Sequence, residues 1–152
     1  MATPSERLRE LGITLPTVNA PAGAYIPAKR TGDLVFTAGQ VPMVDGKIAA
    51  TGKVGAEIDV AQAADLARTC ALSALAAVDA LVGIDAVSGI VKVVGFVASA
   101  PGFTGQPGVL NGASDLLAEV FGEAGRHARS AVGVAELPLG VPVEVELIVE
   151  LA

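Results

Sequence analysis

Residues 141–151 read VPVEVELIVEL, and this stretch near the C-terminus decides what kind of fold the chain can form. Every second residue is Val or Leu, whereas the positions between them include Glu144, Glu146 and Glu150. Because successive side chains of a strand point to opposite faces, this alternation predicts a β-strand with one apolar and one polar face. An apolar sheet face has to be covered, so we expect a layer of helices against it.

Two upstream segments have the apolar spacing of such helices. The first runs from Val60 to about Val82, with Asp59 as its N-cap, Gln62 as the capping-box partner and Gly83 as the stop signal. The second runs from about Pro107 to Phe121. Two helices of this length are enough to cover one face of a small sheet.

The remaining strands are predicted on both sides of these helices. Their segments are residues 24–29, 34–38, 90–98 and 129–136. The β-branched segment 90–98 is expected to be buried on both faces, and Asp45-Gly46 has the chemistry of a tight turn. The resulting order of elements indicates a two-layer α/β (α+β) sandwich with both helices on one sheet face.

The length of 152 residues suits a single domain, in which residues 1–18 form an N-terminal helix and a crossing segment. The helix is predicted by Thr3-Pro4-Ser5-Glu6, which combines an N-cap threonine, a proline at N1 and a glutamate at N3. Apolar residues make up 52% of the chain and the mean hydropathy is +0.61. Part of this apolar surface is therefore expected to close an oligomer.

Charge and cysteine content narrow the range of partners. The net charge is −6 and the Lys and Arg residues are scattered, which argues against DNA or RNA as the main partner. Cys70 is the only cysteine, no apolar leader follows the charged N-terminus, and Pro and Gly break the longest uncharged run, residues 93–114. We therefore expect a cytoplasmic protein that binds neither nucleic acid nor a membrane.

Arg129 is the first candidate for chemistry. In a strand, three very small side chains share its face: Ala131, Gly133 and Ala135. They leave a hollow with a guanidinium at its rim, which suits a carboxylate bound through two hydrogen bonds. The alternative, which is the commoner arrangement for a buried arginine, is an ion pair with Glu144 or Glu146 across the sheet.

Glu144 and Glu146 share one face of an otherwise apolar strand, where one of them could hold a water molecule and exchange protons with it. The alternative is a solvated strand face. His127, the only histidine, is expected at the surface, and Cys70 in the core. No metal or cofactor site is predicted, because His and Cys lie far apart and the glycines match no nucleotide-binding motif.

Two segments carry a family resemblance. RSAVGVAELP at residues 129–138, followed by VEVE at 143–146, resembles the C-terminal signature of the RidA (YjgF) family. Other parts of the family pattern are matched by NAP at 19–21 with Ala24-Tyr25, by FTAGQVP at 36–42, and by Asn111. The resemblance extends from about Asn19 to the C-terminus and is most specific in the C-terminal motif.

The resemblance implies a homotrimer of chorismate-mutase-like subunits, with the sheets facing inward and ligands in clefts between subunits. Active members hydrolyse reactive enamines and imines to 2-keto acids and ammonia without a cofactor. The motif arginine, here Arg129, would bind the substrate carboxylate, and the first glutamate, here Glu144, would orient the water. Four further residues would line the pocket and bind substrate: Tyr25, Gly39, Asn111 and Ala131.

Departures from the family pattern leave two alternatives open. Ala131 stands where many members have cysteine, Ala38 stands where the pattern has serine, and residues 99–108 form a longer stretch. One alternative is therefore a trimer that binds small carboxylates or acts like a chaperone without turnover. The weaker one is an endoribonuclease or translation inhibitor, a description that some relatives carry.

The sheet face that the helices leave uncovered also predicts how subunits assemble. The helices can cover only one sheet face, and we expect the other to carry small or apolar residues beside the glutamates: Ala131, Gly133, Ala135 and Ile148. Leaving such a face in water costs about 25 cal/mol for each Å². Three copies closed around an axis cover this face and remove the cost, so we predict a homotrimer with Arg129 near a subunit boundary. We also expect that a bulky residue in place of Gly133 blocks assembly.

Overall fold

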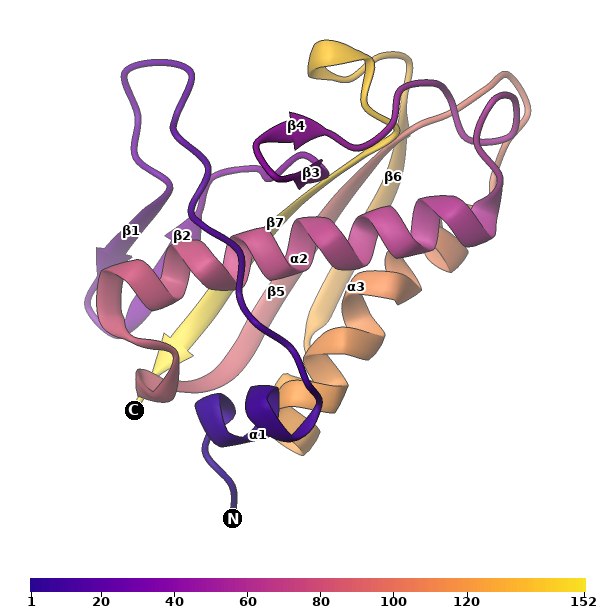
Figure 1. Ribbon diagram of the computed structural model, residues 1–152. Coiled ribbons are helices and arrows are strands. Elements are labelled where there is room, and N and C mark those ends of the chain that lie inside the picture. Colours follow the sequence, from indigo (N-terminus) through magenta and orange to yellow (C-terminus); the bar gives the residue numbers. More distant parts are fainter.

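The computed structural model describes residues 1–152 and places β7 (Val143–Leu151) in the middle of a five-stranded sheet. The strand order is β1-β2-β7-β5-β6, and the helices α2 and α3 lie on one face (Figure 1). The other strands of this sheet are β1 (Ala28–Thr31), β2 (Leu34–Thr37), β5 (Val87–Ala98) and β6 (Ala128–Val134). The predicted two-layer α+β sandwich is thus confirmed.

The alternation of the C-terminal strand is confirmed by its burial. β7 pairs antiparallel with both β2 and β5. Val143, Val145, Leu147 and Val149 face the helices and are each at most 1% exposed. β6 pairs parallel with β5, and α3 forms the crossover that a parallel pair needs.

The helix boundaries follow their capping signals. α2 spans Val60–Val82, and the Asp59 carboxylate accepts a hydrogen bond from the backbone N–H of Gln62 at 2.8 Å. Gly83, with φ of +82°, ends the helix as predicted. α3 spans Gln106–Phe121.

Two glycines let α3 (Gln106–Phe121) pack unusually close to its neighbours. A Cβ atom on Gly112 would lie 1.9 Å from the carbonyl oxygen of Ala64 in α2. A Cβ atom on Gly95 of β5 would lie 2.1 Å from Cδ1 of Leu110. The helix is therefore held at a fixed height and angle over the sheet, which positions every side chain on its inner face.

The N-terminal helix α1 (Pro4–Glu10) has the predicted capping box, with both reciprocal hydrogen bonds between Thr3 and Glu6. The helix is attached to the rest of the fold at Asp85, whose carboxylate accepts hydrogen bonds from the Ser5 backbone and hydroxyl at 2.7 and 2.6 Å. Arg7 Nε also donates to the carbonyl of Glu119 at the end of α3. Asp85 lies in η1 (Ile84–Ala86), one of three short 3₁₀ turns, with η2 (Gly122–Gly125) and η3 (Pro138–Gly140).

Some strand limits differ from the prediction. β1 begins at Ala28 rather than Ala24, since Pro27 has no N–H to donate to a ladder. β6 ends at Val134 rather than at residue 136. The Asp45-Gly46 turn is confirmed: it joins β3 (Met43–Val44) and β4 (Lys47–Ile48), with φ of +51° and +76° at its two residues.

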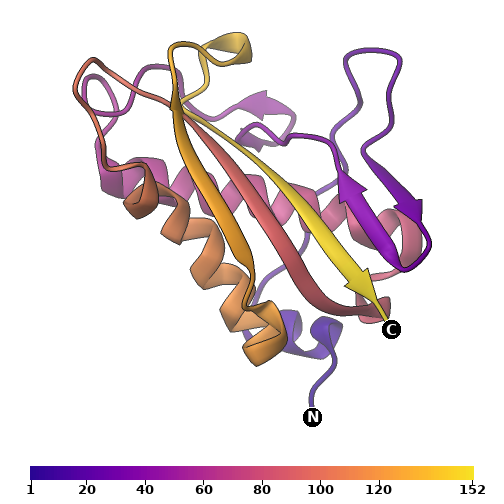
Figure 2. The same ribbon diagram turned by 180° about the vertical axis from the view of Figure 1, so that it is seen from behind.

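The second sheet face has no helix on it (Figure 2). The expectation that residues 90–98 are buried on both faces is therefore wrong for the single subunit: Val93 and Val97 are fully buried, whereas Val94 and Phe96 are partly exposed on the open face. Apolar side chains of other strands are also exposed, including Phe36 at 41% and Val132 at 44%.

The prediction that Ala131 and Gly133 lie on this open face is wrong. The register pairs Ala131 with Gly95 and Gly133 with Val97, so both point to the helix side. A Cβ atom on Gly133 would lie 2.7 Å from Gln106 Nε2 in α3, so a bulky residue there disturbs a contact inside the subunit rather than the open face. No helix in the protein combines the length and the apolar character that crossing a membrane requires.

Candidate functional site

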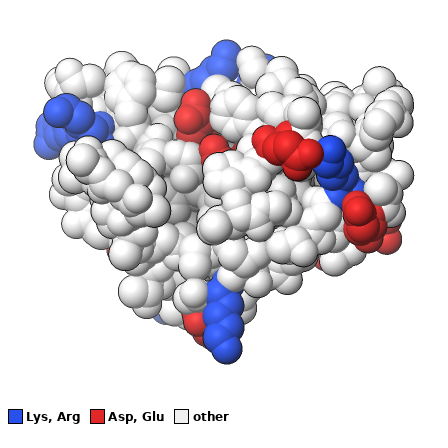
Figure 3. Space-filling model, turned by 90° about the horizontal axis from the view of Figure 1, so that it is seen from above, with Lys and Arg blue, Asp and Glu red and all other residues white.

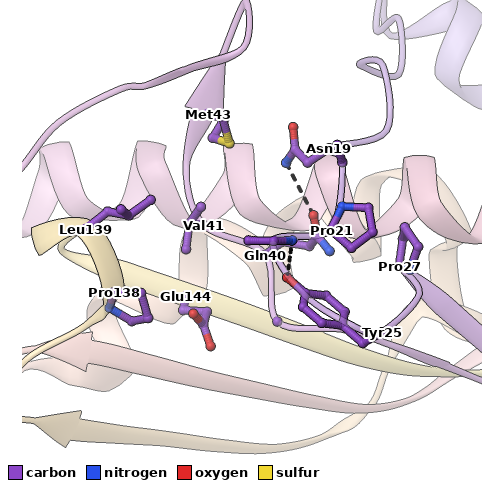
Figure 4. Close-up of a pocket in the computed structure, with 13 residues that line it drawn as sticks. Asn19, Pro21, Tyr25, Pro27, Gln40, Val41, Met43, Pro138, Leu139 and Glu144 are labelled. Atoms are coloured by element: carbon purple, nitrogen blue, oxygen red, sulfur yellow. Dashed lines mark hydrogen bonds between the residues drawn. The ribbon is translucent and has the colours of Figure 1, made fainter.

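Glu144 of β7 lies against a cavity of about 300 Å³ on the open side of the sheet. Its other walls come from residues 19–27, from residues 39–43 and from Pro138 and Leu139 (Figure 4). The segment 39–43 is fixed to β7 because the backbones of Gln40 and Val145 exchange two hydrogen bonds, of 2.8 and 3.0 Å. The cavity floor is therefore part of the sheet.

The Glu144 carboxylate occupies the space that a side chain at position 39 would need. A Cβ atom on Gly39 would lie 2.5 Å from Glu144 Oε2, a distance that real side chains do not tolerate. The absence of a side chain at position 39 is thus what allows the carboxylate to lie against the backbone there. This contact brings two of the predicted site residues together.

The Glu144 carboxyl group is partly buried and accepts no hydrogen bond from another group of the chain. Burial raises its pKa above the ordinary value, and the neighbouring charge of Glu146 raises it further. A carboxyl group whose pKa is shifted toward neutrality is better suited to take up and return protons.

Tyr25 forms the outer wall of this cavity and is 52% exposed. Its hydroxyl oxygen accepts a hydrogen bond from the Ala22 backbone N–H at 3.2 Å. Deeper in the cavity, Asn19 Nδ2 donates to Gln40 Oε1 at 3.4 Å (Figure 4). Tyr25, Gly39 and Glu144 therefore belong to one pocket, as the resemblance implied.

Arg129 lies on the edge strand β6 and reaches toward α3. Its Nη1 atom donates to Asn111 Oδ1 at 2.9 Å and to Ser114 Oγ at 3.1 Å, and Nη2 donates to the Pro107 carbonyl at 3.4 Å. All three acceptors are neutral, and none of the four salt bridges includes Arg129. The guanidinium is partly buried, held in place, and not neutralised by a carboxylate.

The alternative, an ion pair between Arg129 and Glu144 or Glu146, does not form within the subunit. In the register, Arg129 is opposite Val93, whose side chain is buried under the helices, whereas Glu144 is opposite Phe96 on the open face. The arginine and the glutamates therefore extend from opposite faces of the sheet. The cavity beside Glu144 is lined by none of Arg129, Asn111 and Ala131.

The six predicted site residues thus form two groups within one subunit. The acidic group consists of Tyr25, Gly39 and Glu144. The basic group consists of Arg129 with Asn111 bonded to it, and with Ala131 packed against the core one position further along the same strand face. A pocket that contains all six residues does not exist in the single subunit.

Two polar residues of the basic group were missed from the sequence. His127 was expected at the surface, but it is partly buried, with Nδ1 2.6 Å from the Gly125 carbonyl oxygen and Nε2 2.9 Å from Ser114 Oγ. The signal was available: Ser114 follows Asn111 by one helical turn, and His127 precedes Arg129 by two residues.

The expected place of Cys70 in the core is confirmed, since the residue is fully buried. Burial raises the pKa of the thiol well above its ordinary value, which makes it a poor nucleophile. In the whole chain, no three His, Cys, Asp or Glu side chains converge in a way that could hold a metal ion.

Comparison with known proteins identifies the family to which the chain belongs. A family model described as "YjgF/chorismate mutase-like, putative endoribonuclease" matches residues 5–151. Protein TCP17 of Trypanosoma cruzi is 47% identical over 146 residues, which cover 95% of this chain and 91% of that protein. The match covers nearly the full length of both proteins.

Solved structures agree with this assignment. The protein Atu1372 from Agrobacterium tumefaciens is 47% identical with a TM-score of 0.89, and the match covers 96% of this chain and 91% of that one. TdcF from E. coli, solved with bound serine, is 28% identical with a TM-score of 0.65, covering 91% of this chain and 96% of that one. The chain therefore belongs to the YjgF/RidA family of chorismate-mutase-like proteins.

Proposed function

We propose that this protein hydrolyses the enamines and imines of 2-amino acids to 2-keto acids and ammonia. The observation that carries the proposal is the state of Arg129: a fixed guanidinium with neutral partners only, and with free N–H groups. Such a group attracts an anion, and its planar fork fits a carboxylate. The E. coli relative solved with bound serine supports a small ligand of the amino acid type.

The reaction needs no chemistry beyond what two side chains supply. Arg129 binds the substrate carboxylate and so fixes the position of the imine carbon. Glu144 takes a proton from a water molecule as its oxygen bonds to that carbon, and the proton passes to the nitrogen. The C–N bond of the resulting carbinolamine then breaks as its hydroxyl proton passes, through Glu144, to the leaving nitrogen, which releases ammonia and leaves the 2-keto acid.

We further propose that the site is completed between subunits of a homotrimer. The acidic and basic groups extend from opposite sheet faces, so one subunit cannot bring them onto the same substrate. The open face carries exposed apolar side chains that an assembly would cover, among them Phe36 and Val132. A neighbouring subunit that covers this face could also supply the second group.

The proposal is tested by the release of ammonia from imines that an amino acid oxidase generates in situ. Arg129→Ala is expected to abolish the release. Arg126→Ala is the matched control, since Arg126 is exposed and paired only with Glu123 by a surface salt bridge. Equal rates for wild type and Arg129→Ala would contradict the proposal.

A second candidate, carboxylate binding without turnover, is favoured by Ala131 and Ala38 at positions where the family pattern has Cys and Ser. It predicts heat of binding with 2-ketobutyrate or benzoate but no ammonia. Calorimetry beside the ammonia assay separates the two.

The family description also names an endoribonuclease. The face drawn in Figure 3 is mostly uncharged, and its basic side chains lie in small scattered groups, some of them beside acidic ones, which does not favour binding of a polyanion. Cleavage of RNA by purified wild-type protein, lost on Arg129→Ala or Glu144→Ala, would support this activity instead.

A further inference from the structure

The only histidine of the chain lies in a row of hydrogen bonds that begins at the candidate carboxylate-binding arginine and ends at the Gly125 carbonyl. Arg129 Nη1 is 3.1 Å from Ser114 Oγ, Ser114 Oγ is 2.9 Å from His127 Nε2, and His127 Nδ1 is 2.6 Å from the Gly125 carbonyl oxygen. Three elements contribute: α3 holds Ser114, β6 holds Arg129, and η2 holds Gly125, whereas His127 directly precedes β6.

The chemistry of the two ends gives this row one direction. A carbonyl oxygen only accepts, so Nδ1 of His127 must carry the proton and donate to Gly125. In the neutral ring Nε2 then accepts, and the Ser114 hydroxyl donates to it. The lone pairs of Ser114 Oγ remain for Arg129, which can only donate. Each group therefore has a single role.

The far end of the row is rigid. Gly125 is buried, and a Cβ atom on it would lie 2.3 Å from the Leu117 carbonyl oxygen of α3. Its backbone is thus held directly against the helix that also carries Ser114 and Asn111. The row connects Arg129 to a fixed point rather than to a mobile loop.

The row leaves a defined part of the guanidinium free. Both N–H groups of Nη1 are used, by Asn111 and Ser114, and one N–H of Nη2 faces the Pro107 carbonyl at 3.4 Å. The Nε–H and one N–H of Nη2 have no partner in the protein. Nε and Nη2 form the edge of a guanidinium that binds a carboxylate through two parallel hydrogen bonds.

We infer that Ser114 and His127 are positioning residues, which orient Arg129 so that its Nε and Nη2 edge meets the substrate carboxylate. The inference rests on the proposed role of Arg129 in carboxylate binding. Neither residue touches the substrate. They act by removing the rotational freedom of the guanidinium before the ligand arrives.

The first test reads the histidine directly and needs no ligand. Since the chain has one histidine, ¹⁵N NMR of the ring gives one unambiguous pair of signals. At a pH where the ring is neutral, we expect Nδ1 to be protonated and Nε2 not, the opposite of the tautomer that free histidine prefers. In Ser114→Ala the Nε2 signal should shift, because it loses its donor. A ring with the proton on Nε2 would overturn the inference.

The second test measures the affinity for 2-ketobutyrate by calorimetry, with thermal unfolding as the check on folding. Ser114→Ala should weaken binding roughly tenfold, and Ser114→Thr, which keeps the hydroxyl, should recover most of it. Wild-type affinity in a folded Ser114→Ala protein would overturn the inference. If the wild type and Arg129→Ala bind 2-ketobutyrate equally, the proposed carboxylate-binding role of Arg129 fails, and the tautomer still decides whether the row exists.

Discussion

The acidic and basic groups of the candidate site are built in different ways. The group around Glu144 has walls of loops, and its carboxyl oxygens lack a donor within the chain. The group around Arg129 lies between a strand and a helix, and its acceptors are fixed in α3. One group therefore offers unused acceptors and the other unused donors.

This difference fits the roles proposed above for the two groups, carboxylate positioning by Arg129 and proton transfer by Glu144. A positioning group benefits from rigid support, because a small misplacement of the carboxylate moves the reacting carbon away from the water. A proton-transferring group benefits instead from a raised pKa, which burial and Glu146 provide. Tests that separate the two groups therefore have the largest expected effects.

The largest effect is expected from mixing two inactive variants. Arg129→Ala and Glu144→Ala should each release almost no ammonia. If the site lies between subunits of a trimer, trimers formed from an equal mixture regain both groups in about a quarter of their sites. The measurement is ammonia release after co-refolding. A mixture as inactive as its parts, with mixed trimers demonstrated by mass spectrometry, would contradict a shared site.

The next effect concerns the acidic group alone. Gly39→Val should displace the Glu144 carboxylate, because the new side chain needs the space that Oε2 occupies, and the strain should cost about 1–3 kcal/mol of unfolding free energy. Turnover should fall while 2-ketobutyrate still binds, because Arg129 is unchanged. Gly108→Ala is the control, since its Cβ would make only an ordinary contact of 3.5 Å with Val60. Normal turnover in a folded Gly39→Val protein would argue against a role for Glu144.

A smaller effect is expected in the pH dependence of stability. The pKa of Glu144 is raised in the folded state, mainly by burial. Its contribution to the free energy of unfolding is therefore fully present below the ordinary pKa of 4.5 and is lost as the pH rises through the raised value. Urea unfolding across this range should show a decline that Glu144→Gln removes. Glu146→Gln should make the decline shallower, because it removes the second cause of the shift. An unchanged slope in Glu144→Gln would contradict this assignment.

The smallest effect is expected at α1, which lines neither group. Hydrogen bonds from the Ser5 hydroxyl and backbone lower the pKa of Asp85, so this contact stabilises above the ordinary pKa of 3.8 and is lost as the pH falls through the lowered value. Ser5→Ala should reduce the unfolding free energy at neutral pH by at most about 1 kcal/mol, since the contact is exposed. Ammonia release should stay unchanged. A marked loss of turnover would mean that α1 supports the site.

The sequence alone determined the elements and most of the chemistry. The capping box of Thr3, the N-cap of Asp59 and the stop at Gly83 were predicted correctly, because each depends on hydrogen bonds or φ angles within a few residues. The alternation of residues 141–151 identified the buried face of β7 for the same local reason. The C-terminal motif singled out Arg129 and Glu144 as a pair, but not how they lie relative to each other.

Only the tertiary structure decided which way these side chains point. Arg129 faces the helices because β6 pairs in parallel register with β5, which places it beside the buried Val93. His127 became a partner of Ser114 because Gly112 and Gly125 let α3 pack at backbone distance from its neighbours. Strand register and the close packing of helices bring together residues that lie far apart in sequence. They depend on how whole elements pack, which no local pattern of residues encodes.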